Sequence, residues 1–271
     1  MLLVHLTDLH FGCADEQALA AAAKYIQRAK PDAVIVSGDI STIGLQSELN
    51  AACEWMRSLG PPVVVTPGNH DVPYYNPLGR LLFCWDRYDR ATTGLIKSEW
   101  HTPDFSIIPI NTARGLQMRL NWAQGAISHS QIEAASRALQ QAAPGALKIV
   151  VTHHPLDWPN DAPIKGVTIN GARAMGQLTQ AGAELFLSGH LHFASARMIQ
   201  RRALSISSGT LSQRVRHEPC AYTVLRRLPA NTLEVEVMHI KQGVAETASK
   251  RSFDITPSCT PGIPPQVHAA P

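Results

Sequence analysis

Five short apolar segments of this chain each run directly into a motif that contains aspartate, asparagine or histidine. They read HLTDLH (5–10), VIVSGDI (34–40), VVVTPGNHD (63–71), IVVTHHP (149–155) and LFLSGHLH (185–192). Short runs of this kind, rich in valine, isoleucine and leucine, are typical of buried strands. In open α/β sheets, the loops beyond the carboxyl ends of the strands form the ligand crevice. We therefore expect the five motifs to meet at one site.

Strand and helix patterns alternate along the first part of the chain. Strands are expected at residues 2–7, 33–37, 63–66, 106–111, 148–152 and 185–188, and helices at 17–30, 45–59, 130–142 and 171–181. Ser130, with Glu133 three residues later, has the pattern of a capping box at a helix start. Strands that alternate with helices of this length predict βαβ units and a parallel sheet. The expected fold class is therefore α/β.

The last part of the chain has a different pattern. Strands with short connections are expected at residues 203–208, 221–227 and 233–241, as in an antiparallel sheet. Residues 74–104 are irregular and rich in proline, tryptophan, tyrosine and arginine, which predicts a long loop with some helix. Residues 256–271 are rich in proline and are expected to be a disordered tail. This division leaves residues 1–255 as one expected domain.

The amino-acid composition limits the cellular compartment and the binding partners that we expect for this chain. The five cysteines are odd in number and form no CxxC motif, which argues against a disulfide framework and a thiolate zinc site. No apolar run approaches the roughly 18 to 20 residues of a membrane helix, and the first residues, MLLVHLTDLH, lack a signal peptide's basic leader. A net charge of +3 indicates no dedicated nucleic-acid surface. We expect a cytoplasmic protein, and a homodimer is compatible with the sequence.

The polar motifs supply seven candidate metal ligands, all with oxygen or nitrogen donors. They are Asp8, His10, Asp39, Asn69, His153, His190 and His192. Such donors suit Mn, Fe, Zn or Co, and suit neither soft Cu(I) nor an all-oxygen calcium site. Seven ligands are too many for one tetrahedral zinc ion, but they fit two ions that share a carboxylate.

Local sequence explains how some of these side chains reach the same place. Asp8 and His10 are two residues apart, so in an extended segment they point to the same side. A glycine precedes both Asp39 and Asn69, and glycine lets the backbone turn sharply. D-x-H or G-D alone is more often structural than metal-binding, and H-x-H after glycine is more specific. The prediction depends on all five motifs occurring together at strand ends.

In this order, D-x-H, G-D, G-N-H-D, THHP and G-H-x-H resemble the motifs of the calcineurin-like metallophosphoesterase superfamily, over residues 4–192. The resemblance implies a four-layer α/β/β/α sandwich of two mixed β-sheets with a dinuclear metal site at one edge. It assigns one ion to Asp8, His10, Asp39 and His192. It assigns the second ion to Asp39, Asn69, His153 and His190, with Asp39 as the bridging ligand.

Three further polar residues lie next to these candidate ligands. His70 would lie over the substrate phosphate, where it would stabilise the transition state or protonate the leaving oxygen. Asp71 would accept a hydrogen bond from His70 and fix its tautomer, or would only stabilise the turn. As the next residue in an extended chain, His154 is expected to point away from His153, in a supporting or substrate-contacting position.

The motifs THHP and GHLH and the segment SSGTLSQR are most similar to those of bacterial class III cyclic-nucleotide phosphodiesterases. This resemblance implies hydrolysis of small phosphodiesters, such as 3′,5′-cyclic nucleotides, by in-line attack of a metal-bridging hydroxide. The alternatives within the superfamily are a phosphomonoesterase, a lipid-A-pathway nucleotide pyrophosphatase and a nuclease. The alternative from another class is a non-catalytic scaffold with the same fold.

Several residues outside the motifs have open roles. Arg114, Arg214 and Arg216 could reach a phosphate or a base, although solvated arginines are the default interpretation. Four aromatic residues of the 74–104 segment could stack on a base or pack in the core. They are Tyr74, Tyr75, Trp85 and Trp100.

Overall fold

The computed structural model describes residues 1–115, 123–199 and 202–255, which form two six-stranded sheets. The first sheet contains, in spatial order, β12 (Val244–Asp254), β11 (Thr232–Lys241), β10 (Ala221–Leu228), β1 (Leu2–Leu6), β2 (Ala33–Val36) and β3 (Val63–Val65). The second contains β4 (Trp100–His101), β5 (Phe105–Ile110), β6 (Leu147–Thr152), β7 (Leu185–Ser188), β9 (Ala203–Ser207) and β8 (Ser195–Ile199).

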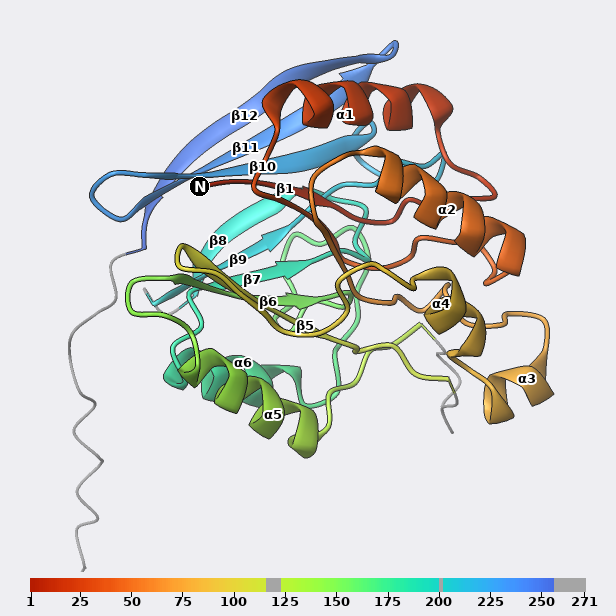
Figure 1. Cartoon of the computed structure of the whole chain (residues 1–271), viewed down its shortest axis with the longest axis horizontal. Coiled ribbons are helices and arrows are strands. Elements are labelled where there is room, and N and C mark those ends of the chain that lie inside the picture. The colour runs from red at the N-terminus through yellow and green to blue at the C-terminus, as the bar shows by residue number, and fades with distance from the viewer. Residues whose placement is uncertain (116–122, 200–201, 256–271) are drawn as a thin grey trace, which may run out of the picture.

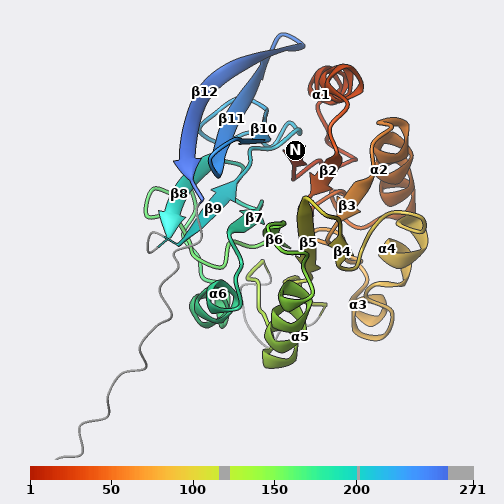
Figure 2. The same cartoon turned by 60° about the vertical axis from the view of Figure 1, so that its left-hand side comes forward.

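The two sheets pack against each other and helices cover their outer faces. The helices α1 (Glu16–Ala29) and α2 (Gln46–Ser58) cover the first sheet, and α5 (His129–Gln140) and α6 (Gly171–Gln180) cover the second (Figures 1 and 2). This is the expected four-layer α/β/β/α sandwich. The short helix α4 (Asp86–Ala91) lies beside α2, and the short helix α3 (Pro77–Leu82) lies next to α4 (Figures 1 and 2).

Three apolar clusters fill the spaces between the layers. Along β1 and β2 the side chains alternate, so that Leu3 and Ile35 face the second sheet while Val4 faces α1 and α2. The third cluster lies between the second sheet and the helices α5 and α6. Both faces of these strands are therefore buried, which explains why they are continuous apolar runs in the sequence.

Strand direction determines where the motifs end up. β1, β2 and β3 are parallel to one another, and β5, β6, β7 and β9 are parallel in the second sheet. β10, β11, β12, β4 and β8 pair antiparallel with their neighbours, so both sheets are mixed, as expected. Because the parallel strands of each sheet end at the same edge, the polar motifs that follow them come together.

Two sequence-based expectations are wrong in detail. Residues 203–207 form β9, which pairs parallel with β7 rather than joining an antiparallel sheet with the strands that follow. Helix α5 begins after Ser128, not Ser130: the Ser128 hydroxyl accepts a hydrogen bond from Gln131 N at 3.2 Å. Gln131 Oε1 in turn accepts one from Ser128 N at 2.9 Å. Both serines have an acidic or amide residue three positions later, so the sequence pattern alone does not discriminate between them.

Three strands were not expected from the sequence, namely β4, β8 and β12. Most side chains of β12 are exposed, so this strand has no alternation of apolar and polar residues to reveal it. The expected loop with some helix at 74–104 is confirmed and contains α3, α4 and β4. The expected tail, residues 256–271, lies outside the described residues. Of the helices in the described part of the chain, none has both the length and the apolar character needed to cross a bilayer.

Candidate metal centre

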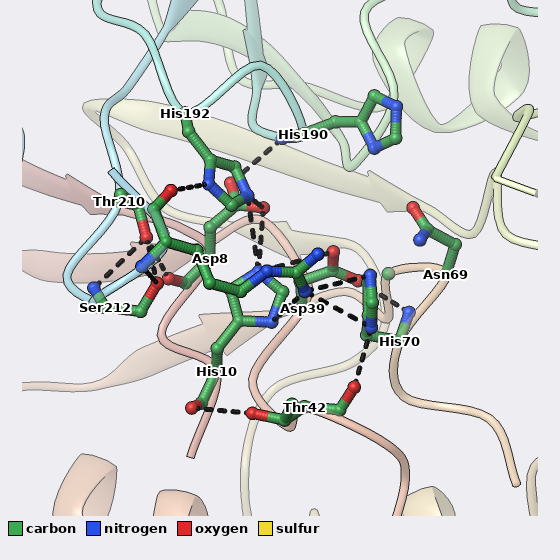
Figure 3. Close-up of polar contacts among 12 residues, drawn as sticks. Asp8, His10, Asp39, Thr42, Asn69, His70, His190, His192, Thr210 and Ser212 are labelled. Atoms are coloured by element: carbon green, nitrogen blue, oxygen red, sulfur yellow. Dashed lines mark hydrogen bonds and ion pairs between the residues drawn. The ribbon is translucent and has the colours of Figure 1, made fainter. Parts of the chain in front are cut away.

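All seven candidate ligands lie at the shared edge of the two sheets. Asp8, Asp39 and Asn69 follow β1, β2 and β3, while His153 and His190 follow β6 and β7. Histidine nitrogens and carboxylate oxygens at this edge, those of His154 included, form three overlapping groups, and within each group all the atoms lie within 4.8 Å of one another. The groups are Asp8, His10 and His192; Asp8, Asp39 and His153; and His153, His154 and His190. Figure 3 shows His10 and His192 beside Asp8, with Asn69 and His190 on the opposite side of the centre.

Five of these residues have a left-handed backbone conformation. They are Asp8, His10, Asp39, His190 and His192, with φ between 45° and 68°. The expectation that Asp8 and His10 converge through an extended segment is therefore wrong. A non-glycine residue in this conformation costs about 1–3 kcal/mol and persists where its surroundings hold it. Asp8 N donates to Gly38 O and His10 N donates to Asp39 O, both at 3.0 Å, so neighbouring loops hold this backbone in place.

Glycines allow the loops of the two sheets to approach closely. A Cβ atom on Gly38 would lie 2.7 Å from His153 Nδ1, and one on Gly189 would lie 2.7 Å from Asp8 Oδ2. Real Cβ atoms do not come so close to their neighbours. Gly38, before Asp39, and Gly189, before His190, are thus required for clearance as well as for turning the chain.

The imidazole Nε2 atoms point at the carboxylates. His192 Nε2 lies 3.1 Å from Asp8 Oδ1, and His153 Nε2 lies 3.3 Å from Asp39 Oδ2. His10 Nε2 lies between the two carboxylates, 3.7 Å from Asp8 and 3.8 Å from Asp39. Asn69 Oδ1 is 3.2 Å from His153 Nε2. The Asp39 carboxylate therefore occupies the position between the two halves of the centre.

Backbone carbonyls bind the opposite nitrogen of three rings. Nδ1 is 3.3 Å from Ser41 O in His10, 2.8 Å from Ser37 O in His153 and 2.6 Å from Arg214 O in His192. A carbonyl can only accept, so each Nδ1 carries a proton, and in the neutral form of each ring the Nε2 atom directs a lone pair inward. This is the tautomer that metal-binding histidines adopt when a carbonyl orients them.

This tautomer provides a test of whether the residues suit a metal ion. With Nδ1 protonated, the lone pair of His192 Nε2 faces the buried oxygen Asp8 Oδ1, which has no hydrogen-bond partner among the described residues. Two lone pairs at this distance repel each other unless a positive charge lies between them. Although burial opposes protonation, the Asp8 carboxylate raises the pKa of His192, so a proton takes this place when no ion is bound. A divalent cation supplies that charge, and the donor set of carboxylate, amide and imidazole suits it. The residues therefore fit the metal site that the sequence predicts.

Burial and mutual charge shift the pKa values of these groups in opposite directions. Burial alone disfavours the charged form of Asp39, but the His153 imidazole beside it holds its pKa well below the usual range. Burial also opposes protonation of His153, yet the Asp39 carboxylate raises the pKa of His153 to about 9. Burial lowers the pKa of His10 and of His190 to about 3. These two rings are consequently neutral at pH 7, whereas His153 would release its second proton when a metal ion binds.

The structure corrects the expected partner of His70. His70 Nδ1 lies 2.7 Å from the carbonyl oxygen of Thr42, and Asp71 makes no hydrogen bond to it among the described residues. Asp71 instead accepts hydrogen bonds from Gly68 N at 2.8 Å, Ser41 N at 2.9 Å and Ser41 Oγ at 2.8 Å. Burial, and then the nearby Asp39, raises the pKa of Asp71 to about 7. Asp71 therefore lies where its second interpretation, that of a residue that only stabilises the turn, requires it to be.

His154 also differs from expectation. Its ring does not point away from the centre but packs against His153, at a centroid distance of 4.8 Å, and against His190, at 4.7 Å. Its Nδ1 is 2.9 Å from Thr112 Oγ1 and its Nε2 is 3.0 Å from Ala123 O. Because both nitrogens already have protein partners, His154 lies beside the centre as a supporting side chain.

A cavity of about 270 Å³ opens over the candidate ligands. Asp39, Asn69, His70, His190 and His192 reach it from the centre. The remaining lining residues are Ala123, Gln124, Trp158, Ile164, Lys165, Gly166, Arg214 and Arg216. Two of the three arginines singled out from the sequence therefore line this cavity, and Arg114 is not among its lining residues.

The aromatic residues of the 74–104 segment have separate positions. The Tyr74 ring stacks on His70 with a centroid distance of 6.0 Å and an interplanar angle of 7°, and Tyr75 contacts Tyr74. Trp85 packs on Tyr88, and Trp100 packs on Phe105 in the second sheet. Only Tyr74 thus touches a cavity residue through a ring contact among the described residues.

Sequence reasoning missed two residues that shape the site. Thr210 Oγ1 donates to Asp8 O at 2.6 Å, and Thr42 supplies the carbonyl that orients His70. Both act on partners more than 25 positions away in the chain. Such contacts leave no local pattern, so nothing in the sequence identifies them.

The chain belongs to the calcineurin-like phosphoesterase family, whose model matches residues 1–194. A protein from Synechococcus sp. named Probable cyclic nucleotide phosphodiesterase is 30% identical over 80 residues, which are 26% of this chain and 31% of that protein. Glycerophosphodiester phosphodiesterase GpdQ from Enterobacter lignolyticus is 34% identical over 94 residues, 29% of this chain and 34% of that protein. The chain thus matches about a third of the length of either curated relative.

The fold has solved counterparts over nearly its whole length. A dimetal phosphatase from Danio rerio superposes with a TM-score of 0.67 at 12% identity, covering 94% of this chain and 99% of that chain. At this identity the likeness shows the fold alone. The expected superfamily and fold class are confirmed.

Proposed function

We propose that this chain is a metal-dependent phosphodiesterase that hydrolyses small phosphodiesters with the help of two divalent cations. One observation carries the proposal: the buried Asp39 carboxylate lies between two sets of inward-pointing donor atoms, beneath an open cavity. A carboxylate in that position can bridge two ions. The family membership and the names of the two curated relatives, both phosphodiesterases, support the same reaction class.

The family resemblance suggests the two ligand sets, and the closeness of the donor atoms supports them. Asp8, His10, Asp39 and His192 would hold one ion, and Asp39, Asn69, His153 and His190 would hold the other. When bound, a pair of divalent ions neutralises a phosphoryl oxygen and lowers the pKa of a water molecule. Mn, Fe, Zn and Co all suit these donors.

The chain's own residues then complete the site. With His70 Nδ1 donating to Thr42 O, Nε2 is the nitrogen left to face the cavity. In the imidazolium form of His70, the Nε2 proton would pass to the leaving oxygen as the bond from that oxygen to phosphorus breaks. A water molecule that has lost one proton to solvent would form the new bond to phosphorus on the opposite side. His70 N also donates to Asp39 Oδ1 at 2.8 Å, which keeps the loop of His70 against the centre. Asp71 would not contact the substrate and would contribute only by stabilising the turn that carries His70.

The substrate class is the finer part of the proposal. The cavity is of the size that a small diester needs. The names of the two relatives point to cyclic nucleotides and glycerophosphodiesters as candidates. A phosphomonoester, a nucleotide pyrophosphate and a nucleic acid are the alternatives to include in a test.

The test uses one purified sample that is first stripped with a chelator and then loaded with Mn²⁺, Fe²⁺, Zn²⁺ or Co²⁺. Turnover of bis(p-nitrophenyl) phosphate, a cyclic nucleotide, a glycerophosphodiester and p-nitrophenyl phosphate is measured for each metal. We expect diester turnover that is lost on chelation and restored by at least one ion. No turnover with any ion, in a protein that binds metal, would instead favour the non-catalytic scaffold.

A further inference from the structure

The cavity carries more positive charge than a simple diester requires. Three cationic side chains line it, Arg214, Arg216 and Lys165, against one carboxylate, Asp39. Asp39 faces the candidate ions rather than the cations. None of the three cations makes an ion pair with a carboxylate among residues 1–115, 123–199 and 202–255. Arg216 is attracted by the Asp8 carboxylate, but Asp8 is itself a candidate metal ligand, so no carboxylate is dedicated to these cations among the described residues.

The position of Arg214 is fixed by its backbone. Arg214 O accepts the hydrogen bond from His192 Nδ1 at 2.6 Å, and Arg214 N donates to Ser212 Oγ at 3.3 Å. Ser212 Oγ is 2.7 Å from Thr210 Oγ1, which in turn donates to Asp8 O (Figure 3). The loop that carries both arginines is thus attached directly to two candidate ligands, so its side chains are delivered to the metal centre.

The Arg214 guanidinium lies within reach of any group bound over the centre. Its Nη1 is 3.1 Å from His70 Nε2 and 3.4 Å from His10 Nδ1. His10 Nδ1 already donates to Ser41 O and cannot accept from the guanidinium, and His70 Nε2 can accept only when it is unprotonated. The planar donors of a guanidinium match instead the oxygens of a phosphate or a carboxylate. An oxyanion beside the centre would be a stronger partner, and Arg216 lines the same cavity.

Charge balance then points to the kind of oxyanion. If the proposed function holds, two divalent ions already attract the phosphoryl group that reacts, and a diester phosphate carries only one negative charge. The two guanidinium groups would add two further positive charges to those of the ions. A substrate with a second phosphoryl group next to the reacting one would supply the missing counter-charge.

Building on the proposed phosphodiesterase function, we propose that Arg214 and Arg216 form a subsite for a second phosphoryl group of the substrate, adjacent to the reacting one. The substrate class that satisfies it is a disubstituted pyrophosphate. Each phosphorus of such a compound has two bridging oxygens and one negative charge, so the reaction remains that of a diesterase. A diester with a separate phosphate close by on its alcohol presents the same chemistry.

The first arm of the test measures anion binding without catalysis. Chelator-treated, metal-free protein is titrated by calorimetry with inorganic pyrophosphate and with inorganic phosphate. We expect pyrophosphate to bind about tenfold or more tightly than phosphate, as one added charge-assisted contact would give. Arg214→Gln and Arg216→Gln should each reduce this ratio. Arg173→Gln, an exposed arginine on α6 outside the cavity, should keep it.

The second arm measures kcat/KM of the metal-loaded protein. The substrates are diadenosine pyrophosphate, thymidine 3′-phosphate 5′-(p-nitrophenyl phosphate) and bis(p-nitrophenyl) phosphate. Arg216→Gln should lower kcat/KM at least tenfold more for a substrate with two phosphoryl groups than for the simple diester. If kcat/KM falls selectively for diadenosine pyrophosphate, the subsite binds the second phosphoryl group of a pyrophosphate linkage. If it falls selectively for thymidine 3′-phosphate 5′-(p-nitrophenyl phosphate), the subsite binds a separate phosphate.

Two results would overturn the subsite. One is equal binding of pyrophosphate and phosphate by the metal-free protein, and the other is an equal loss of kcat/KM for all three substrates in both variants. The thermal unfolding of each variant is compared with that of the wild type to exclude misfolding. If the wild type hydrolyses nothing with any ion, the proposed function fails, and the binding arm alone still decides whether the subsite exists.

Discussion

His70 Nδ1 lies 2.7 Å from the carbonyl oxygen of Thr42, and this contact decides which nitrogen of His70 faces the cavity. The carbonyl accepts a hydrogen bond from Nδ1–H, so Nε2 is left for the substrate. The aspartate next in sequence, Asp71, faces away into a turn and accepts hydrogen bonds from Gly68 and Ser41. A main-chain oxygen thus takes the orienting role that the sequence suggested for a carboxylate.

Replacing His70 by alanine should slow diester cleavage without removing the metal ions. The expected loss in kcat is about two to four orders of magnitude, the range for a general acid or a key hydrogen-bond donor. Steady-state kinetics with bis(p-nitrophenyl) phosphate measures the rate, and elemental analysis measures the metal content. Unchanged turnover at full metal occupancy would remove His70 from the mechanism.

Replacing Asp39 by asparagine should release metal. The substitution preserves the shape of the side chain but removes the negative charge between the two halves of the centre. We expect the metal content to fall from two ions per chain to one or fewer, measured by elemental analysis after dialysis. The matched control is Asp157→Asn, which breaks an ion pair with Arg197 outside this cavity and should retain both ions. Full occupancy in Asp39→Asn would contradict a bridging role.

Replacing Asp71 by asparagine should reduce stability. Asp71 accepts three hydrogen bonds in a fully buried turn, and the amide NH₂ group would face a donor at one of them. A buried donor left without an acceptor costs about 1–3 kcal/mol. Urea unfolding of the metal-free proteins measures the difference in the free energy of unfolding. A difference near zero would show that the turn does not need the carboxylate.

Replacing Gly68 by alanine should also destabilise the protein, because the new Cβ would lie 2.8 Å from Asp39 Cγ. The expected change in the free energy of unfolding is about 1–3 kcal/mol, typical of overpacking, with loss of metal binding. Gly176→Ala is the matched control: it lies in α6, has no neighbour within 4 Å and should gain up to about 1 kcal/mol. Calorimetry compares the two variants. Similar behaviour of the two would contradict a close approach at Gly68.

The stabilising effect of Glu236 should depend on pH. Burial opposes its charge, but the Thr247 hydroxyl and the Arg226 guanidinium lower the pKa of Glu236 below its ordinary value of 4.5. A lowered folded-state pKa adds stability above the unfolded pKa, and this is lost as the pH falls through the folded pKa. Glu236→Gln should therefore destabilise by less than about 1 kcal/mol at pH 7, and by less still below about pH 4. Urea unfolding at both pH values checks the sign, and a larger difference at low pH would refute it.

The sequence determined the family, the α/β class and the positions of the strands that lead into the site. Those strands are apolar on both faces, and each ends where a glycine or a polar residue appears, as around Asp39 and Asn69. The resulting pattern is local and periodic, so it can be detected without knowing what packs against what. The β12 strand, with its exposed and polar side chains, has no such pattern and was not expected.

The tertiary structure decided which atoms face each other. The left-handed backbone at Asp8 and His10, the Thr42 carbonyl beside His70 and the loop that places Arg214 over the centre all depend on contacts between distant segments. The packing of His154 against His153 likewise contradicts the orientation expected from an extended chain. The physical reason is that hydrogen bonds and clearances between loops select one conformation among those that the local sequence allows.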